Sequence, residues 1–425
     1  MTKTQAYLNA RMLPARKVFS ETVDDGDDPN AVNTDFPSPT RPRVIMLGMR
    51  GFPDVQGGVE KHTEKLARAL LALGWNVEAI VRNRYVSRLQ KSWCGVNFTR
   101  IWAPHIKGLE TVIHSFLGVL YAGISRPDIL HIHGIGPAFF VPLARAFGLK
   151  VVVTCHSLNY QHRKWGLLAR SIFRAGEWAG MRFANGRISV SRFLADKMRS
   201  AYDVSVSTIP NGIDKPANVR SRGTLDKFGL EADRYALCVA RIDEEKRQLD
   251  LIRAYSQIAT PDFKLVLAGD VDYSGRHARM VSEVVKRTPG VVMLGYQSAA
   301  SLAELYANAA IFVLPSANEG QPIVVLEALS YGLPVLLSDI AAHRDMTIPR
   351  VRYFPVGDIE MLTKYLAEIS EAPPQRLSVL DRRHVLAKYE WREIATRTLE
   401  VYVSALGSSR NPVLHGSFSR GGMSK

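Results

Sequence analysis

The sequence predicts an α/β protein with two domains, each built on a parallel sheet. Short apolar, β-branched runs alternate with amphipathic segments along most of the 425-residue chain. Strands that are apolar almost throughout are typical of parallel sheets whose two faces are both covered by helices. The alternation stops at a polar linker near residues 215–233 and then starts again, so we expect two sheets.

The first domain is expected over residues 43–214 and the second over residues 215–390, followed by a C-terminal helix at 391–405. Strands of the first domain are expected at 44–48, 77–81, 98–101, 129–132, 151–155 and 188–190. Its clearest helix is 59–73, which Gly74 closes as the C′ residue. Strands of the second domain are expected at 235–239, 263–268, 291–294, 311–314 and 335–337. Its helices are expected at 249–258, 276–286, 301–309 and after Pro322.

The two ends of the chain predict disordered tails. The first tail covers residues 1–42, of which 18–42 are acidic and contain proline without apolar periodicity, and residues 406–425 are rich in glycine and serine. The 3 cysteines are far apart, which argues against a disulfide framework and against a cysteine-ligated zinc site. No apolar run is long enough to cross a membrane, and the N-terminus lacks an apolar signal-peptide core. We therefore expect a cytoplasmic protein.

The net charge of +15 is concentrated in one half of the chain. Residues 41–214 carry 24 Lys and Arg against 10 Asp and Glu, whereas residues 215–405 carry 24 of each sign. Such an excess indicates an anionic partner for the first domain: nucleic acid, an anionic membrane or a phosphorylated substrate. Solubility alone is the alternative explanation.

A glycine-rich loop follows the first expected strand. It runs from Gly48 to Gly57 and Gly58, which open the helix at 59–73. Adjacent glycines at a helix start let backbone N–H groups approach a phosphate, although a simple tight turn would need them too. The loop matches neither the dinucleotide-binding GxGxxG pattern nor the P-loop.

Two cations, Arg241 and Lys246, follow the first strand of the second domain. In open parallel sheets ligands bind beyond the carboxyl ends of the strands, so this pair could hold a diphosphate. The alternative is a solvated turn in which both cations pair with Asp243, Glu244 and Glu245.

The segment from Leu314 to Glu327 carries the most specific pattern. Glu319 follows a strand end, where a carboxylate is a natural acceptor for sugar hydroxyls, and Gly320 gives the loop freedom. Pro322 is expected in the first helical turn and Glu327 in the second. The free N–H groups near residues 322–324 could meet phosphates. Helix capping is the alternative role for Glu319.

These motifs together resemble glycosyltransferase family 4 over residues 43–405. The resemblance rests on RIDEEK (241–246), Gly269-Asp270, Gly295-Tyr296, PSANEG (315–320) and the pair Glu319 and Glu327. The first half is similar to a branch of bacterial rhamnosyl- and exopolysaccharide glycosyltransferases, through RGFPDVQGGVEKHTEKLA, HIHGIGPAFF, VVVTCHSLNYQHRKWG and IPNGID. Ser157 departs from that branch, which often has glycine there.

The resemblance implies a GT-B fold, in which two Rossmann-like domains face each other across a cleft, and a retaining transferase that uses a nucleotide-diphosphate sugar. It implies that Arg241 and Lys246 hold the diphosphate, that Glu319 and His156 contact the donor sugar, and that Glu327 contacts the ribose. The further donor-binding residues that it implies are Gly57, Gly58, Gly320, Gln321, Ile323 and Val324. It also implies no cofactor and no metal, in agreement with the lack of an Asp-x-Asp motif after a strand.

His131 and His133 alternate on one strand, but without a third ligand they are expected to be cleft or packing residues.

Residues 163–187 combine arginines with Trp165, Leu168 and Ile172 at helical spacing. Such a helix can lie at an anionic membrane surface, and the alternative is a helix packed into the core with its basic side in water. We expect peripheral attachment to the inner face of the cell membrane and a polyprenyl-diphosphate-linked acceptor, as in related enzymes that build surface polysaccharides, and no nucleic-acid partner.

The sequence therefore predicts a retaining glycosyltransferase of bacterial surface polysaccharide synthesis. Two alternatives remain: another GT-B nucleotide-sugar enzyme such as an epimerase, and a catalytically silent lipid- or nucleic-acid-binding relative.

Overall fold

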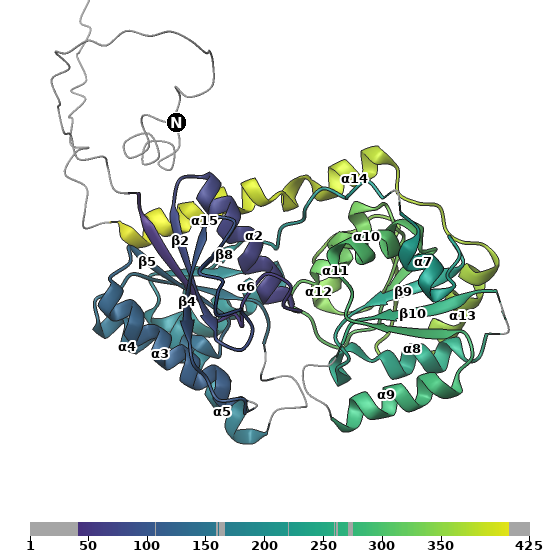
Figure 1. Cartoon of the computed structure of the whole chain (residues 1–425), viewed down its shortest axis with the longest axis horizontal. Coiled ribbons are helices and arrows are strands. Elements are labelled where there is room, and N and C mark those ends of the chain that lie inside the picture. The colour runs from purple at the N-terminus through teal and green to yellow at the C-terminus, as the bar shows by residue number, and fades with distance from the viewer. Residues whose placement is uncertain are drawn as a thin grey trace, which may run out of the picture.

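The computed structural model describes residues 41–407 except 107, 159, 161–165, 220, 259, 261 and 271–274. Apart from residues 41–42 and 406–407, the two predicted tails lie outside the described residues. Figure 1 shows two α/β lobes side by side, the first purple to teal and the second green. Each lobe contains one sheet, so the predicted pair of parallel-sheet domains is confirmed.

The first sheet has the strand order β3-β4-β2-β1-β5-β6-β7-β8. Its strands are β1 (Arg43–Leu47), β2 (Asn76–Arg82), β3 (Ser92–Trp93), β4 (Val96–Ile101), β5 (Ile129–His133), β6 (Val151–Cys155), β7 (Gly186–Ser189) and β8 (Ser207–Thr208). All neighbours pair in parallel except β3 and β4, which form an antiparallel pair.

Helices cover both faces of this sheet, as its apolar strands require. Val44 and Met46 of β1 pack toward α2 (Gly58–Ala72) and α15 (Trp391–Leu406), whereas Ile45 and Leu47 pack toward α3 (Leu109–Ser125) and α4 (Val141–Ala146). Side chains alternate between the two faces of a strand, which is why one short strand serves both cores. The remaining elements are the 3₁₀ helix η1 (Pro137–Phe140), α5 (Leu167–Phe183) and α6 (Arg192–Tyr202).

The second sheet has the order β11-β10-β9-β12-β13-β14 and is parallel throughout. Its strands are β9 (Tyr235–Val239), β10 (Lys264–Ala268), β11 (Val291–Gly295), β12 (Ile311–Leu314), β13 (Val335–Ser338) and β14 (Arg352–Phe354). Its helices are α7 (Gly223–Phe228), η3 (Glu244–Lys246), α8 (Gln248–Tyr255), α9 (Arg276–Arg287), α10 (Ala299–Asn308), α11 (Ile323–Ser330), α12 (Ala341–Arg344), α13 (Ile359–Glu371), α14 (Val379–Leu386) and η4 (Ala387–Tyr389).

In each sheet the strand order reverses beside the first strand, between β1 and β5 in the first sheet and between β9 and β12 in the second. At such a switch point the connections on either side run to opposite faces and leave a crevice at the carboxyl edge. The loops after β1, β9 and β12 are those whose motifs stood out in the sequence.

The predicted strands at 151–155, 235–239 and 311–314 are confirmed residue for residue, and the others lie within two residues of their predicted ends. Gly74 has a φ of 86° just beyond α2, as expected of a C′ glycine. Pro322 is the residue before α11 and not part of its first turn, because the helix begins at Ile323. The sequence analysis missed β3, β8 and β14, which are too short to show a pattern.

The last helix returns to the first domain. α15 packs against α2 and the first sheet, as the yellow helix along the first lobe in Figure 1 shows. Leu399 and Tyr402 of α15 are fully buried there with Leu66 and Trp75. The core of the first domain therefore includes residues that follow the second domain in sequence.

We predict that Leu399→Ala lowers the free energy of unfolding of the first domain by about 2–5 kcal/mol, because it leaves a cavity in this shared core. All 6 tryptophans lie in residues 43–214 or in α15, so urea unfolding followed by tryptophan fluorescence reports this domain. The exposed Arg392→Ala in the same helix is the control, with an expected change below about 0.5 kcal/mol. Equal stability of both variants would contradict the shared core.

Candidate active site

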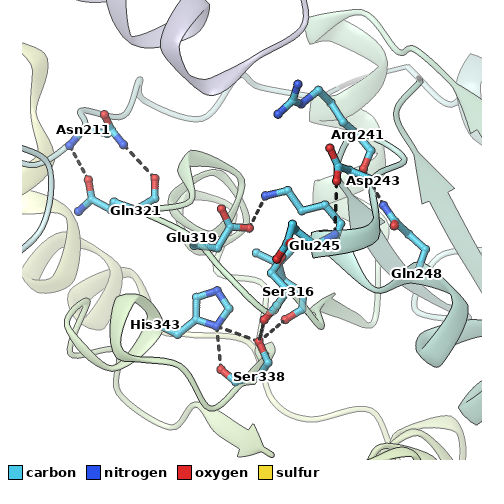
Figure 2. A network of polar contacts seen from close by, with 12 residues as sticks. Asn211, Arg241, Asp243, Glu245, Gln248, Ser316, Glu319, Gln321, Ser338 and His343 are labelled. Atoms are coloured by element: carbon cyan, nitrogen blue, oxygen red, sulfur yellow. Dashed lines mark hydrogen bonds and ion pairs between the residues drawn. The ribbon is translucent and has the colours of Figure 1, made fainter. Parts of the chain in front are cut away.

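The loop after β9, which carries the predicted diphosphate-binding residues Arg241 and Lys246, is held by hydrogen bonds within the second domain. After β9 the chain passes Arg241 and enters η3, whose N-cap Asp243 accepts from the Glu245 amide at 3.4 Å. Gln248 donates to the Arg241 carbonyl at 2.7 Å, and the Ala317 amide donates to the Glu245 carbonyl at 2.8 Å. The loops after β9 and β12 are thus joined, and the Arg241 and Glu319 side chains face the same space (Figure 2).

Lys246 and Glu319 form an ion pair at the centre of this space. Burial by itself raises the pKa of Glu319, but the Lys246 ammonium, together with His343 and a hydrogen bond from Ser316, holds that pKa below its usual value. Glu319 is therefore an ionised carboxylate at neutral pH. The structure brings these two predicted site residues into direct contact, which the sequence analysis had not anticipated.

Buried hydrogen bonds among His343, Ser338 and Ser316 support the loop that carries Glu319. His343 donates from Nδ1 to the Ser338 carbonyl at 2.8 Å, and the Ser338 hydroxyl donates to the Ser316 carbonyl at 2.5 Å (Figure 2). Burial lowers the pKa of His343, so its ring is neutral near pH 7. These hydrogen bonds fix the backbone just before Glu319.

Glu327 lies in the second turn of α11, as predicted, and is bound from both domains. The Tyr306 hydroxyl of α10 donates to its Oε2 at 2.8 Å, and the Lys61 ammonium of α2 pairs with its Oε1. Burial lowers the pKa of Lys61. Lys61 and Tyr306 were not predicted, because nothing in their local sequence indicates a partner on a distant element.

The loop after β12 also touches the first domain. A Cβ atom at position 320 would overlap the carbonyl oxygen of His156, so only glycine allows the observed approach. Asn211 donates from its side-chain amide to the Gln321 carbonyl at 2.9 Å, and its backbone N–H donates to the Gln321 side chain. The IPNGID segment is thus a contact between the domains.

The glycine-rich loop takes the place that its sequence predicts. Gly57 precedes α2 with a φ of 154°, and a Cβ there would overlap the Glu60 carboxylate. A Cβ on Gly58 would meet nothing within 4 Å, so this position is open. Gln56 of the same loop reaches the second domain, where its Nε2 lies 3.2 Å from where a Cβ on Gly269 would be.

A crevice of about 160 Å³ lies between the two domains beside Glu327. Its walls are the linker after Asn211, the helices α10 and α11, and the first residue of α15, and Lys61, Tyr306, Glu327, Tyr331 and Trp391 line it.

Four histidines gather at the carboxyl edge of the first sheet. One nitrogen each of His62, His133 and His156 lies within 4.8 Å of the others, so these three imidazoles could in principle hold a metal ion. His131 does not join them, because the Tyr402 and Thr154 hydroxyls lie 2.7 Å from its two ring nitrogens. The sequence analysis did not anticipate that His62 and His156 lie beside His133.

Comparison with known proteins identifies the family. Residues 56–215 match the family model described as Glycosyltransferase Family 4, and residues 225–389 match that described as Glycosyl transferases group 1. The chain belongs to glycosyltransferase family 4. The curated relatives include glycogen synthase of Mycobacterium tuberculosis (24% identical, covering 87% of this chain and 96% of that one) and α-maltose-1-phosphate synthase of the same species (28%, covering 85% and 98%).

Solved structures with the same fold include sucrose-phosphate synthase of Thermosynechococcus elongatus, with a TM-score of 0.72 and 22% identity over 85% of this chain and 98% of that one. The Anabaena protein HepE in complex with UDP-glucose has a TM-score of 0.69 and 16% identity over 84% and 98%. The predicted GT-B fold of this family 4 glycosyltransferase is confirmed, and the chain is an enzyme of the glycosyltransferase class.

We predict that Lys246→Met lowers the free energy of unfolding at pH 7 by roughly 2–4 kcal/mol, because it leaves the buried Glu319 carboxylate without its counter-charge. In the wild type the lowered Glu319 pKa contributes stability above its unfolded value of about 4.5, which is lost as the pH falls through the folded value. In the variant, burial raises the Glu319 pKa, and only the smaller effects of His343 and of the Ser316 hydrogen bond still lower it. The difference between the proteins should therefore shrink as the pH falls from 7 toward 4.5.

Urea titrations at several pH values, followed by far-UV circular dichroism, measure this difference. The exposed pair Arg352–Glu368 in the same domain provides the control, and Arg352→Met should change stability by less than about 1 kcal/mol. A loss in Lys246→Met that does not vary with pH would show that the ion pair is not its cause.

Proposed function

We propose that this glycosyltransferase is a retaining enzyme that moves a sugar from a nucleoside-diphosphate donor to an acceptor held by the first domain. The observation that carries the proposal is the pair of cations, Arg241 and Lys246, at the switch point of the second sheet. Glu319 lies on the next strand end of the same switch point. A diphosphate and its attached sugar need this combination of cations and a hydroxyl acceptor.

The cations act on the charge that the reaction creates. When the glycosidic C–O bond breaks, the diphosphate leaves with the bonding electrons and becomes more negative. Lys246 has by then exchanged its Glu319 partner for a phosphate oxygen of the bound donor, and Arg241 offers its planar fork to another. The start of α11 offers backbone N–H groups from Gln321, just before the helix, and from its first residues Ile323 and Val324. The helix dipole favours a negative charge at this end. Donors fixed at such a position lower the barrier directly.

The contacts beside the diphosphate position indicate where the sugar and the ribose of the donor would bind. Glu319, once released by Lys246, accepts hydrogen bonds from sugar hydroxyls. Glu327 accepts from the ribose hydroxyls in place of Lys61, while Tyr306 keeps its other oxygen oriented. His156 contacts the sugar from the first domain. The complex of the related Anabaena protein with UDP-glucose supports a nucleotide sugar as the donor.

The acceptor side of the proposal rests on the outer surface of the first domain. α3 is apolar on its exposed side, with Ile124 85% exposed, and it contacts η1, which in turn contacts α5. On α5, Leu168 is 77% exposed, so the alternative of a core-packed stripe fails for this residue. Arg174 and Arg182 are exposed on the same helix.

Apolar side chains flanked by arginines are suited to binding an anionic membrane. Three other residues of the predicted membrane segment, Arg163, Lys164 and Trp165, lie outside the described residues. No helix among the described residues is long and apolar enough to cross a bilayer. We therefore propose peripheral attachment at the inner face of the cell membrane, with a polyprenyl-diphosphate-linked saccharide as acceptor. A curated relative over 42% of the chain, the Escherichia coli O-antigen chain mannosyltransferase B, agrees with a role in surface polysaccharide synthesis.

We predict that Arg241→Ala and Lys246→Ala each lower kcat/KM by about two to three orders of magnitude, because each removes a donor that stabilises the leaving diphosphate. The assay is a screen of UDP-, GDP- and dTDP-sugars with lipid-linked saccharide acceptors, in which product analysis also gives the anomeric configuration. The neighbouring Arg247→Ala is the control, since this arginine pairs with Asp250. Near-normal rates in a folded Lys246→Ala protein would contradict the diphosphate role, and turnover of a donor without any acceptor would indicate an epimerase.

We predict that transfer continues in excess EDTA, because the proposed charge stabilisation comes from fixed cations and helix N–H groups. The measurement compares initial rates with EDTA, with Mg²⁺ and with Mn²⁺ after the protein has been freed of metals. Loss of activity that Mg²⁺ or Mn²⁺ restores would contradict a metal-free mechanism.

We predict that the protein sediments with liposomes containing anionic phospholipid at low salt and that binding weakens as salt rises, since each basic residue near the surface contributes about 1 kcal/mol. The double variant Arg174→Gln/Arg182→Gln should bind more weakly than wild type. Arg279→Gln/Arg287→Gln, which removes two exposed arginines of α9 in the second domain, should bind like wild type. Wild type that stays in the supernatant would contradict the membrane proposal.

A further inference from the structure

His133 and His156 form a hydrogen bond between two imidazole rings. His133 Nδ1 lies 3.2 Å from His156 Nε2, and the two residues come from neighbouring strand ends, the last residue of β5 and the first residue after β6. Burial, followed by the neighbouring histidines, lowers the pKa of both rings well below the usual value. A ring nitrogen that accepts a hydrogen bond has no proton of its own, so the ring that accepts in this contact carries its single proton on its other nitrogen. One of the two facing nitrogens must donate and the other accept.

The surroundings of His133 decide which nitrogen donates. Among the described residues, His133 Nε2 is buried and has no hydrogen-bond partner. If the His133 proton were on Nε2, a buried N–H group would be left without an acceptor. Buried backbone N–H groups without a partner are rarer than under-satisfied carbonyls, and we extend this preference to the ring nitrogens. The proton therefore belongs on Nδ1, from which it is donated to His156 Nε2.

We propose that His133 is a positioning residue that fixes the tautomer of His156, so that His156 carries its proton on Nδ1 and presents an N–H donor to the donor sugar. The inference rests on the proposed contact between His156 and that sugar. It also specifies the contact: a hydroxyl oxygen of the donor accepts from His156, whereas Glu319 accepts from another hydroxyl. His156 therefore recognises one hydroxyl group as an acceptor, and Glu319 recognises another hydroxyl group as a donor.

The remaining contacts hold His133 itself in place. Its ring lies against that of His131, with 4.0 Å between the centroids and 35° between the ring planes. His131 is fixed on both sides by the Tyr402 and Thr154 hydroxyls at 2.7 Å. Tyr402 comes from α15, so the C-terminal helix sets the wall against which His133 packs.

The test uses two substitutions of His133 that differ in one property. His133→Asn keeps an amide nitrogen near the place of Nδ1 and can still donate to His156, whereas His133→Leu has a similar size and cannot. Tyr402→Phe removes a buried hydrogen bond of the same cluster without touching the His133–His156 contact, and it is the control for structural damage. Circular dichroism and thermal midpoints establish that each variant is folded.

The direct measurement is the ¹⁵N spectrum of the histidine rings in the full-length protein, with the His156 signals assigned by their loss in His156→Gln. We expect the Nδ1–H tautomer of His156 in wild type, in His133→Asn and in Tyr402→Phe, and a changed or mixed tautomer in His133→Leu. An Nε2–H tautomer in wild type, or the wild-type tautomer in His133→Leu, would overturn the inference.

Kinetics separate this inference from the function on which it rests. With the donor found in the screen, kcat/KM should fall about ten- to a hundredfold in His133→Leu and stay within about threefold in His133→Asn. Equal losses in both variants would mean that His133 acts through packing alone and would overturn the inference. Full activity of His156→Ala, with the expected spectra, would remove the proposed sugar contact and leave the tautomer assignment standing.

Discussion

The close approach of Gly320 to the His156 carbonyl is the constraint on which the cleft depends. It brings the loop after β12 of the second sheet against the loop after β6 of the first, so that the carboxyl edges of two separate sheets share one space. A side chain at position 320 would push these edges apart. The hydrogen bonds between Asn211 and Gln321 add a second contact between the domains, one residue further along the loop after β12.

Around this contact the charged side chains form ion pairs with one another, and the proposed donor would replace one partner in each pair. Lys246 neutralises Glu319, and Lys61 reaches across from the first domain to Glu327. An unpaired buried charge is costly, so each pair offsets the burial of its two charged members. A diphosphate can take over Lys246, and hydroxyl groups can take over both carboxylates. Because Lys61 belongs to the first domain, the proposed replacement of Lys61 by a donor ribose at Glu327 would also change a contact between the domains.

The sequence predicted the fold well because its strands are apolar and bounded by polar loops, which is a local property. It also placed Arg241, Lys246 and Glu319 beyond strand ends and Glu327 in the second turn of a helix, since these positions need only the limits of the strands and helices. It could not show that Lys246 pairs with Glu319, or that Lys61 and Tyr306 share Glu327, because these contacts join elements that are far apart in the chain. The histidine cluster is hidden for the same reason: its members are ordinary in their own segments and meet only when α2, β5 and β6 are assembled.

The central claim is that Lys246 holds the diphosphate of a donor nucleotide at the edge of the second sheet. Calorimetric titration of UDP, GDP and dTDP into wild type and Lys246→Ala tests it without any knowledge of sugar or acceptor. The account predicts that at least one of these nucleotides binds to wild type and that its affinity falls at least tenfold in the variant. Equal affinity in the two proteins, or no binding of any of the three to wild type, would contradict it.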